Sequence, residues 1–266
     1  MYRIYVIPGS HACRAGMLML EHKGVPYRAV NFVTLTHPVL SRLHGFDAGG
    51  QTRTAGGKRT FGLWFGDHLG TVPGLAANGD RVSTNHGIAR YLEERHPDPP
   101  LFPADPERRA AVEEAESWAN ETLQMAARRI VGIEAVRDPA RFARATADGR
   151  MGHLLYRHAL ARRLVVPNIL GRVFVTHPGV EDELAAELEE MLDRIDQLIA
   201  DGVIGGDEPN VADLMIAPSL ALILYREDVR PAFEGRPALE LVDRILPEPA
   251  GAAAQGSSPA RNQAGA

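Results

Sequence analysis

The sequence has very little cysteine and lysine. Cys13 is the only cysteine among the 266 residues, so no disulfide can form within the chain. A chain without disulfides is typical of a reducing compartment, and we expect a cytoplasmic location. Lysine occurs only at Lys23 and Lys58 although arginine is abundant. We attribute that imbalance to the nucleotide composition of the source genome and not to function.

The sequence also lacks a basic block and a long apolar run. The net charge is -5 at pH 7, which argues against nucleic acid as the main partner. The apolar run from Leu214 to Leu224 contains Pro218 and Ser219 and is shorter than the roughly 20 residues that a membrane span needs. The first residues are typical of a strand and not of a signal peptide. We therefore expect neither nucleic acid nor a membrane as a partner.

The stretch 8–25 links a predicted strand to a predicted helix, and both candidate nucleophiles lie where they meet. The first amides of a helix have no internal partner and carry partial positive charge, so an anion in front of them is stabilised. Ser10 and Cys13 place an oxygen and a sulfur at this helix start. Arg14 adds a cation, which we expect to brace the helix and not to contact the substrate.

The first part of the chain has the element order of a thioredoxin-like domain. A βαβ unit with parallel strands is predicted from a strand, a helix and a strand over 2–7, 12–23 and 27–33. The sequence Asn78-Gly79-Asp80 between short apolar runs predicts an antiparallel hairpin, and a helix over 85–95 follows it. This βαβ-ββα order predicts an α/β domain over residues 1–95.

The remainder predicts an all-α domain over 107–248, a helical bundle joined to the first domain by a proline-rich linker at 96–106. Four helices are expected, over 107–130, 138–162, 180–199 and from 211 onward. Asn210 can cap the last helix while Asp213 reaches back to the cap, which is a capping box. Residues 249–266 have no periodicity and predict a disordered tail.

Four segments of the chain resemble the cytosolic glutathione transferases. They are PGSHACRAGMLMLEHKGVPY at 8–27, TVPGL at 71–75, VSTNHGIARYLEERHPDPPLFP at 82–103 and DEPNVADLMIAPSL at 207–220. The resemblance implies a thioredoxin-like N-terminal domain and a helical C-terminal domain. It also implies glutathione or another small thiol as co-substrate, and a homodimer with the active clefts beside the subunit interface. It assigns no class.

The resemblance further implies which residues bind the thiol. Val72-Pro73 matches the family's Val-Pro, in which the proline is cis and the preceding backbone pairs with the cysteinyl part of glutathione. Thr84 and Asn85 stand where the family has an acidic residue or Gln followed by Ser, and are expected to hold the glutamyl carboxylate at a helix start. The acid that pairs with the glutamyl ammonium is absent, and Thr71 replaces a common Lys. These departures leave the identity of the thiol open.

By the same resemblance, Ser10 is the hydroxyl that activates the thiol. A hydrogen bond to sulfur at a helix start lowers the thiol pKa, and the thiolate is the nucleophile. The alternative is a plain N-cap, and the two roles are compatible. Cys13 completes an S-x-x-C pattern where redox relatives carry C-x-x-C. It is either a lone reactive thiol that forms mixed disulfides or a buried side chain that only fills space.

The sequence offers a few further candidates around the site. The segment 46–66 reads as an insertion, and we expect Arg53, Lys58 or Arg59 to meet an anionic group at the rim of the ligand cleft. The alternative is a surface hairpin without a ligand role. His11 could line the site or simply pack. No metal-ligand spacing occurs, so we expect no metal.

Three functions therefore stay open. The first is an enzyme that adds a small cysteinyl thiol to an apolar small-molecule electrophile. The second is a non-catalytic relative of the glutathione transferases that binds a ligand or a protein through the same cleft. The third is a thiol reductase or deglutathionylase that depends on Cys13.

Overall fold

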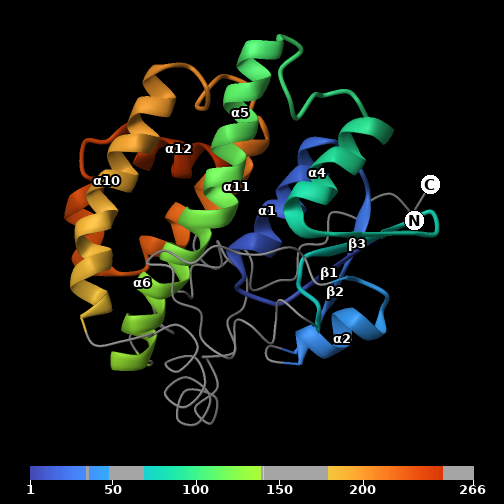
Figure 1. Cartoon of the computed structure of the whole chain (residues 1–266), viewed down its shortest axis with the longest axis horizontal. Coiled ribbons are helices and arrows are strands. Elements are labelled where there is room, and N and C mark those ends of the chain that lie inside the picture. Colours follow the sequence, from blue (N-terminus) through green and yellow to red (C-terminus); the bar gives the residue numbers. More distant parts are fainter. Residues whose placement is uncertain (34–35, 48–68, 139, 141–178, 248–266) are drawn as a thin grey trace, which may run out of the picture.

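A four-stranded sheet forms the centre of the N-terminal domain (Figure 1). The computed structural model describes residues 1–33, 36–47, 69–138, 140 and 179–247. The strands are β1 (Tyr2–Val6), β2 (Tyr27–Asn31), β3 (Gly74–Ala77) and β4 (Asp80–Ser83), in the spatial order β2-β1-β3-β4. β1 pairs with β2 in parallel and with β3 antiparallel, and β3 and β4 form the antiparallel hairpin. The predicted βαβ-ββα order is thereby confirmed.

Three described helices accompany the sheet, α1 (His11–His22), α2 (His37–Leu43) and α4 (Thr84–Arg95). α1 ends where predicted, because Gly24 adopts a positive φ of 61° and Val25 donates its amide to the carbonyl of Leu20. The sequence did not predict α2, whose seven residues are too few to give a clear helical period. α1 and α4 pack against each other, which brings the starts of two helices together.

The C-terminal domain is entirely helical in its described part. Its elements are α5 (Pro106–Trp118), the π-helical segment η1 (Ala119–Leu123), α6 (Gln124–Arg137), α10 (Val180–Ala200), α11 (Val211–Ile223), the 3-10 segment η5 (Glu227–Phe233) and α12 (Pro237–Ile245). α5, η1 and α6 follow one another without a break. The helix predicted over 107–130 is therefore present, longer than expected and with a π-helical turn inside it.

α11 is the central helix of this domain, since each of its residues is buried. It contacts α5, α6 and α12 and also packs on α1, so it connects the two domains (Figure 1). The predicted capping box is confirmed. The side chain of Asn210 accepts from the amides of Ala212 and Asp213, and Asp213 accepts from the amide of Asn210 at 2.9 Å.

The linker is held between the two domains. Leu101 and Phe102 are buried, and the amide of Leu101 donates to Oε2 of Glu93 at 2.9 Å. The same carboxylate accepts from the buried ammonium of Lys23 at 2.6 Å. The amide of Val211, at the start of α11, donates to the carbonyl of Leu101 at 3.0 Å. These hydrogen bonds tie the linker to α4, to α1 and to the start of α11. They therefore hold α11 in its position against α1.

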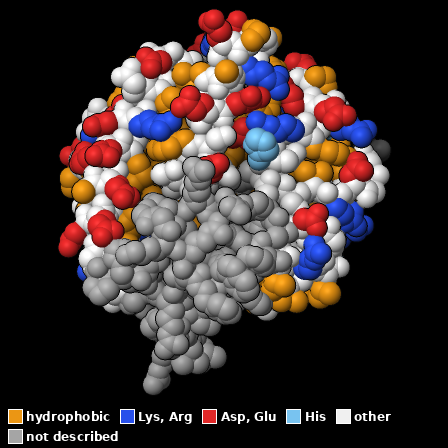
Figure 2. Space-filling model, viewed as in Figure 1, with side chains coloured by type: hydrophobic (Ala, Val, Ile, Leu, Met, Phe, Trp, Pro, Cys, Tyr) orange, Lys and Arg blue, Asp and Glu red, His pale blue; other side chains and the backbone are white. Residues whose placement is uncertain are grey.

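Several predictions fall outside the described residues. They concern nearly all of the helix over 138–162 and of the insertion 46–66, with Arg53, Lys58 and Arg59, and the tail 249–266. Among the helices that are described, none has both the length and the apolar character needed to cross a membrane. Arginine and acidic side chains alternate over the described surface visible in Figure 2, which carries no continuous basic patch.

Candidate functional site

Ser10 lies at the N-terminus of α1 with its hydroxyl placed at the free amides. Its backbone is extended, and Oγ accepts from the amide of Cys13 at 3.2 Å, so Ser10 is the N-cap that the sequence predicted. The hydroxyl also hydrogen-bonds the Cys13 thiol, so its hydrogen would have to turn from Cys13 toward a ligand sulfur. The Ser10 side chain is only partly buried. A sulfur anion near this helix start would meet both a hydroxyl donor and the positive end of the helix.

The segments named as site residues by the sequence come together around Gly16 of α1. A Cβ at Gly16 would lie 3.2 Å from Cγ of Pro73 and 3.1 Å from Oδ1 of Asn85. These contacts are tighter than is usual for a Cβ, so a side chain at Gly16 would force its neighbours to shift by a few tenths of an ångström. The amide of Thr84 also donates to the carbonyl of Pro73 at 3.2 Å. The predicted thiol-binding segments are therefore neighbours.

The peptide bond between Val72 and Pro73 is cis, as expected. Among described residues outside the regular helices and strands, no backbone group bonds to the amide or the carbonyl of Val72. The Val72 carbonyl accepts only a 3.4 Å bond from the hydroxyl of Thr71. Apart from the Thr71 bond, the backbone donor and acceptor of Val72 have no such partner among the described residues, which fits a peptide ligand that pairs as an added strand would.

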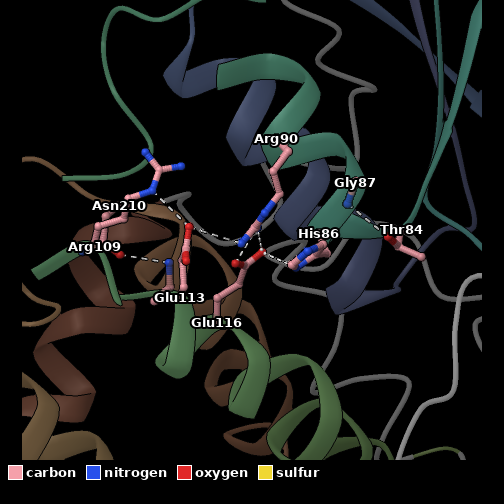
Figure 3. Close-up of polar contacts among 9 residues, drawn as sticks. Thr84, His86, Gly87, Arg90, Arg109, Glu113, Glu116 and Asn210 are labelled. Atoms are coloured by element: carbon pink, nitrogen blue, oxygen red, sulfur yellow. Dashed lines mark hydrogen bonds and ion pairs between the residues drawn. The ribbon is translucent and has the colours of Figure 1, made fainter. Parts of the chain in front are cut away.

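Thr84 has an unusual backbone conformation at the start of α4. Its φ is +68°, in the left-handed region that a β-branched residue rarely adopts. Its Oγ1 accepts from the amide of Gly87 at 3.1 Å, which gives α4 a cap (Figure 3). Backbone strain of this kind gathers at ligand sites, where the surrounding structure maintains it.

Asn85 does not face outward from the start of α4. It is buried, and its Nδ2 donates to the carbonyl of Ala12 at 2.9 Å. Its Oδ1 is buried and has no hydrogen-bond partner in the described part of the protein. An acceptor oxygen cannot hold a carboxylate, and the donor is already used on α1. This geometry disfavours the predicted contact between the Asn85 side chain and a ligand carboxylate.

Cys13 is in a different environment from Ser10, although both lie on the first turn of α1. Its side chain is buried, with 2% of the residue exposed. Burial raises the pKa of Cys13 to about 11, against a smaller lowering by the hydrogen bond from Ser10. A thiol with this pKa is protonated at pH 7 and is a poor nucleophile. The environment therefore favours the space-filling interpretation of Cys13 over the reactive one.

Arg14 braces α1, as expected. Its Nη1 donates to both carboxylate oxygens of Glu21, at 3.0 and 3.1 Å. The hydroxyl of Tyr27 donates to the same carboxylate at 2.7 Å. Glu21 thereby joins two positions about two turns apart on α1 and also contacts β2, so that the helix is held against the sheet.

A cluster of ion pairs connects α4 to α5 beside this site (Figure 3). Arg90 donates to Oε1 of the buried Glu116 at 2.6 Å, and Nδ1 of His86 lies 3.4 Å from the same oxygen. Burial raises the pKa of Glu116, and the hydrogen bond from Arg90 opposes that rise. Arg90 also lies 4.6 Å from the ring centre of Phe102 in the linker. Through Arg90, α4 of the sheet domain is therefore held against both α5 and the linker, close to the start of α4.

A second polar cluster lies where α6 meets the starts of α1 and α2. His11 follows Ser10 directly, and 2% of the residue is exposed. Its ring forms a hydrogen bond with the backbone carbonyl of Gln124. Arg128, one turn along α6, lies 3.5 Å from Oε1 of Gln124 and is close enough to His11 and His37 to lower the pKa of each. Three side-chain nitrogens here are buried without a partner among the described residues: His11 Nε2, His37 Nδ1 and Gln124 Nε2.

The sequence offered no reason to single out His37, Gln124 or Arg128. A signal existed only in their polarity, because Gln124 stands between the buried residues Leu123 and Met125. The π-helical turn η1 just before Gln124 changes the direction of the following side chains, and such turns are frequent at functional sites. Within the described ranges, no group of three or more His, Cys, Asp or Glu side chains is placed to hold a metal ion.

Comparisons with known proteins agree with this architecture. Residues 166–242 match the family of the glutathione S-transferase C-terminal domain. No curated protein matches the chain. Among solved structures, a glutathione transferase from Phanerochaete chrysosporium is similar with a TM-score of 0.61 and 20% identity, over 92% of this chain and 95% of that one.

Two further structures that resemble this chain contain bound ligands. A glutathione S-transferase from Methylobacterium radiotolerans JCM 2831, in complex with glutathione sulfonate, has a TM-score of 0.53 and 19% identity, over 94% of this chain and 92% of that one. A glutathione S-transferase of Ceriporiopsis subvermispora, in complex with glutathione, has a TM-score of 0.54 and 18% identity, over 92% of this chain and 97% of that one. Residues 166–242 thus match the glutathione S-transferase C-terminal domain, and the chain as a whole has the fold of the glutathione transferases, with no class assigned.

Proposed function

We propose that this protein is a thiol transferase that joins glutathione, or a similar small cysteinyl thiol, to a small-molecule electrophile. The observation that carries the proposal is the placement of Ser10. Its hydroxyl caps α1, can turn its hydrogen from the Cys13 thiol toward a ligand sulfur, and lies at the start of the helix that Pro73 and Asn85 contact. Two similar proteins were solved with glutathione or its sulfonate, which supports a thiol peptide as ligand.

In the proposed reaction the thiol first loses its proton to solvent. The Ser10 hydroxyl donates to the resulting thiolate, and the free amides of α1 add their partial positive charge. A sulfur lone pair then forms the bond to the electrophilic carbon. With a chloro-nitro aromatic, the ring electrons move onto the nitro group and return as chloride leaves with its bonding pair. The backbone of Val72 holds the thiol peptide as an added strand.

The test is the Ser10→Ala variant in conjugation of a chloro-nitro aromatic with glutathione. A hydrogen bond to a charged group contributes about 1.5–3 kcal/mol, so we expect kcat/KM for glutathione to fall about 10- to 100-fold near pH 7. The change also removes an N-cap, which costs about 1 kcal/mol of stability.

A matched control separates these two effects. Asp105 caps α5 by accepting from the amide of Arg108 at 2.9 Å, away from the site. Asp105→Ala should lose similar stability and keep its activity. Full activity in Ser10→Ala would remove the proposed role of Ser10.

A non-catalytic protein that binds a ligand through the same cleft is the second candidate. The observation that favours it is Asn85, whose amide is bonded to Ala12 and does not face a ligand. A thermal shift with a panel of small thiols distinguishes the candidates when combined with the kinetics, since a ligand that binds the native state raises the melting temperature. A thiol that binds without conjugation would favour this second function.

The homodimer and the cytoplasmic location are part of the same proposal. The resemblance to glutathione transferases supports both, and the lack of an internal disulfide supports the location. Sedimentation at micromolar concentration tests the dimer.

A further inference from the structure

One face of the continuous helix formed by α5, η1 and α6 is held against the sheet domain at two places. On α5, Oε1 of Glu116 accepts from Arg90 of α4 at 2.6 Å, and Nδ1 of His86 lies 3.4 Å from the same oxygen (Figure 3). Further along, the backbone carbonyl of Gln124 accepts a hydrogen bond from the ring of His11, the first residue of α1. These contacts set the helix opposite the starts of α4 and α1.

Asn120 lies between these two contacts. It follows Glu116 by four residues and precedes Gln124 by four, so the helical period places it on the same face. The π-helical turn maintains that alignment, because the amide of Gln124 donates to the carbonyl of Ala119, five residues earlier. The wider turn offsets the drift that an α-helix shows over eight residues. The side chain of Asn120 is therefore on the face that meets the sheet domain.

The side-chain amide of Asn120 is not used within the fold. Other faces of the same turn are occupied, since Leu123 is fully buried and the guanidinium of Arg194 on α10 lies 4.7 Å from the ring centre of Trp118. Asn120 is only partly buried, and its amide has no hydrogen-bond partner in the described part of the protein. A molecule bound between this helix and the starts of α1 and α4 can therefore reach the amide.

The helix starts that Asn120 faces are those where the thiol is proposed to bind. Nδ2 of Asn85, in the first turn of α4, donates to the carbonyl of Ala12 in the first turn of α1, so the two starts are adjacent. Ser10 caps α1 at this place. Since the thiol peptide is proposed to pair with Val72 of the sheet domain, the electrophile approaches the sulfur from the side of the helical domain. Asn120 lies on that side.

We propose that Asn120 is a catalytic residue that donates a hydrogen bond to an oxygen of the electrophile. The electrophiles are then compounds whose reacting carbon is conjugated to an oxygen, such as enones and nitroaromatics. This inference rests on the proposed thiol transferase and narrows it, because the sequence alone predicted only an apolar electrophile. A carbonyl or nitro oxygen accepts hydrogen bonds and donates none, so the N–H half of the amide meets it.

In the reaction with an enone, the sulfur lone pair forms the bond to the β-carbon. The alkene pair moves to the bond between the α-carbon and the carbonyl carbon, and the carbonyl pair moves onto the oxygen. Nδ2–H of Asn120 stabilises this developing oxyanion as a fixed donor. The enolate then takes a proton from water at its α-carbon. With a nitroaromatic, the charge collects on the nitro oxygens and meets the same donor.

The test compares benzylideneacetone, an enone, with benzyl chloride, each with saturating glutathione. In benzyl chloride the chloride leaves with its bonding pair and no charge develops on oxygen. Asn120→Leu keeps about the same volume and removes the donor. It should lower kcat for the enone about 10- to 100-fold and change kcat for benzyl chloride less than about twofold. KM for the enone should change little, because the oxygen becomes charged only in the transition state.

Two further variants complete the design. Asn120→Asp keeps the shape and the acceptor oxygen but replaces the donor by a carboxylate, so it should lower kcat for the enone at least as much as Asn120→Leu. Full activity of Asn120→Asp on the enone would overturn the inference, because the residue would then act as an acceptor. Thr122→Val is the matched control. It changes a partly buried side chain on a different face of the same turn and should leave both substrates unchanged.

The two substrates also separate this inference from the proposed function. If the wild type conjugates benzyl chloride but not benzylideneacetone, the inference is overturned and the transferase proposal stands. An equal loss on both substrates in Asn120→Leu has the same meaning, because the residue would then act on the thiol or on the fold. If the wild type conjugates neither compound, the transferase proposal fails and the inference fails with it.

Discussion

At the scale of single residues, the start of α1 gives two neighbouring nucleophile-type side chains opposite environments. Ser10 is partly exposed and caps the helix, whereas Cys13 is buried and its pKa is raised by burial to about 11. The hydroxyl can therefore meet a ligand sulfur, while the thiol remains protonated within the core. The difference follows from position along the helix, since Ser10 is the extended N-cap residue outside α1, whereas Cys13 lies within the first turn, which packs in the core.

We predict that Cys13→Ala keeps conjugation activity within about twofold. The substitution removes only a small buried side chain, so the cost in stability should be about 1 kcal/mol. Steady-state kinetics and urea unfolding of the same protein measure both quantities. A loss of activity above about tenfold in a folded variant would instead support a function that depends on Cys13.

The titration of His37 gives a prediction for stability against pH. Burial, and then Arg128, lowers its pKa from 6.5 to about 4. Between these values the unfolded chain binds a proton that the folded chain does not, so His37 makes stability fall as pH falls through this window. Between pH 6.5 and pH 5 the loss is about 2 kcal/mol.

Urea unfolding at about pH 7 and pH 5 checks this value in the wild type and in His37→Gln. The variant should lose about 2 kcal/mol less than the wild type over that interval. Identical losses in the two proteins would show that His37 titrates normally in the folded state.

At the scale of elements, the junction between α4 and α5 is maintained by a buried charge. Glu116 is fully buried on α5, and its partners, the Arg90 guanidinium and the His86 ring, come from α4 (Figure 3). A buried carboxylate is tolerated only with close partners, because desolvation is costly. The pair thus depends on a defined arrangement of α4 and α5.

We predict that Arg90→Met destabilises the protein by about 3 kcal/mol, because it leaves Glu116 buried without its main partner. The double variant Arg90→Met with Glu116→Leu should recover most of that loss, since no buried charge remains. Arg95→Met, which removes an exposed pair at 4.0 Å from Asp80, is the control and should change stability by less than about 1 kcal/mol. Equal effects of Arg90→Met and Arg95→Met would contradict this account of the junction.

At the scale of the whole molecule, much of the architecture could be predicted because local rules agree with the fold. Strand runs, the Asn78-Gly79 turn and the capping box at Asn210 each act over a few residues, and each is confirmed. The orientation of the Asn85 side chain and the hydrogen bond between His11 and the backbone of Gln124 could not be predicted. They depend on how α4 and α6 pack on α1, and single-sequence patterns carry no information on contacts more than 70 residues apart.

Ser10 shows both sides of this limit. Its cap is a local feature that the sequence predicted, whereas its proposed role as a thiol activator depends on the packing of Pro73 and Asn85 against Gly16 of the same helix. The structure adds this packing. The activation of the thiol is a property of the complex between protein and thiol, so it is best measured on that complex.

The most direct measurement is the pKa of glutathione bound to the protein, followed through the ultraviolet absorbance of the thiolate as pH is raised. A hydroxyl hydrogen bond worth about 1.5–3 kcal/mol corresponds to about one to two pKa units. We predict that the bound thiol titrates well below free glutathione in the wild type, and about one to two units higher in Ser10→Ala than in the wild type. A bound thiol with the same pKa in both proteins would contradict the account.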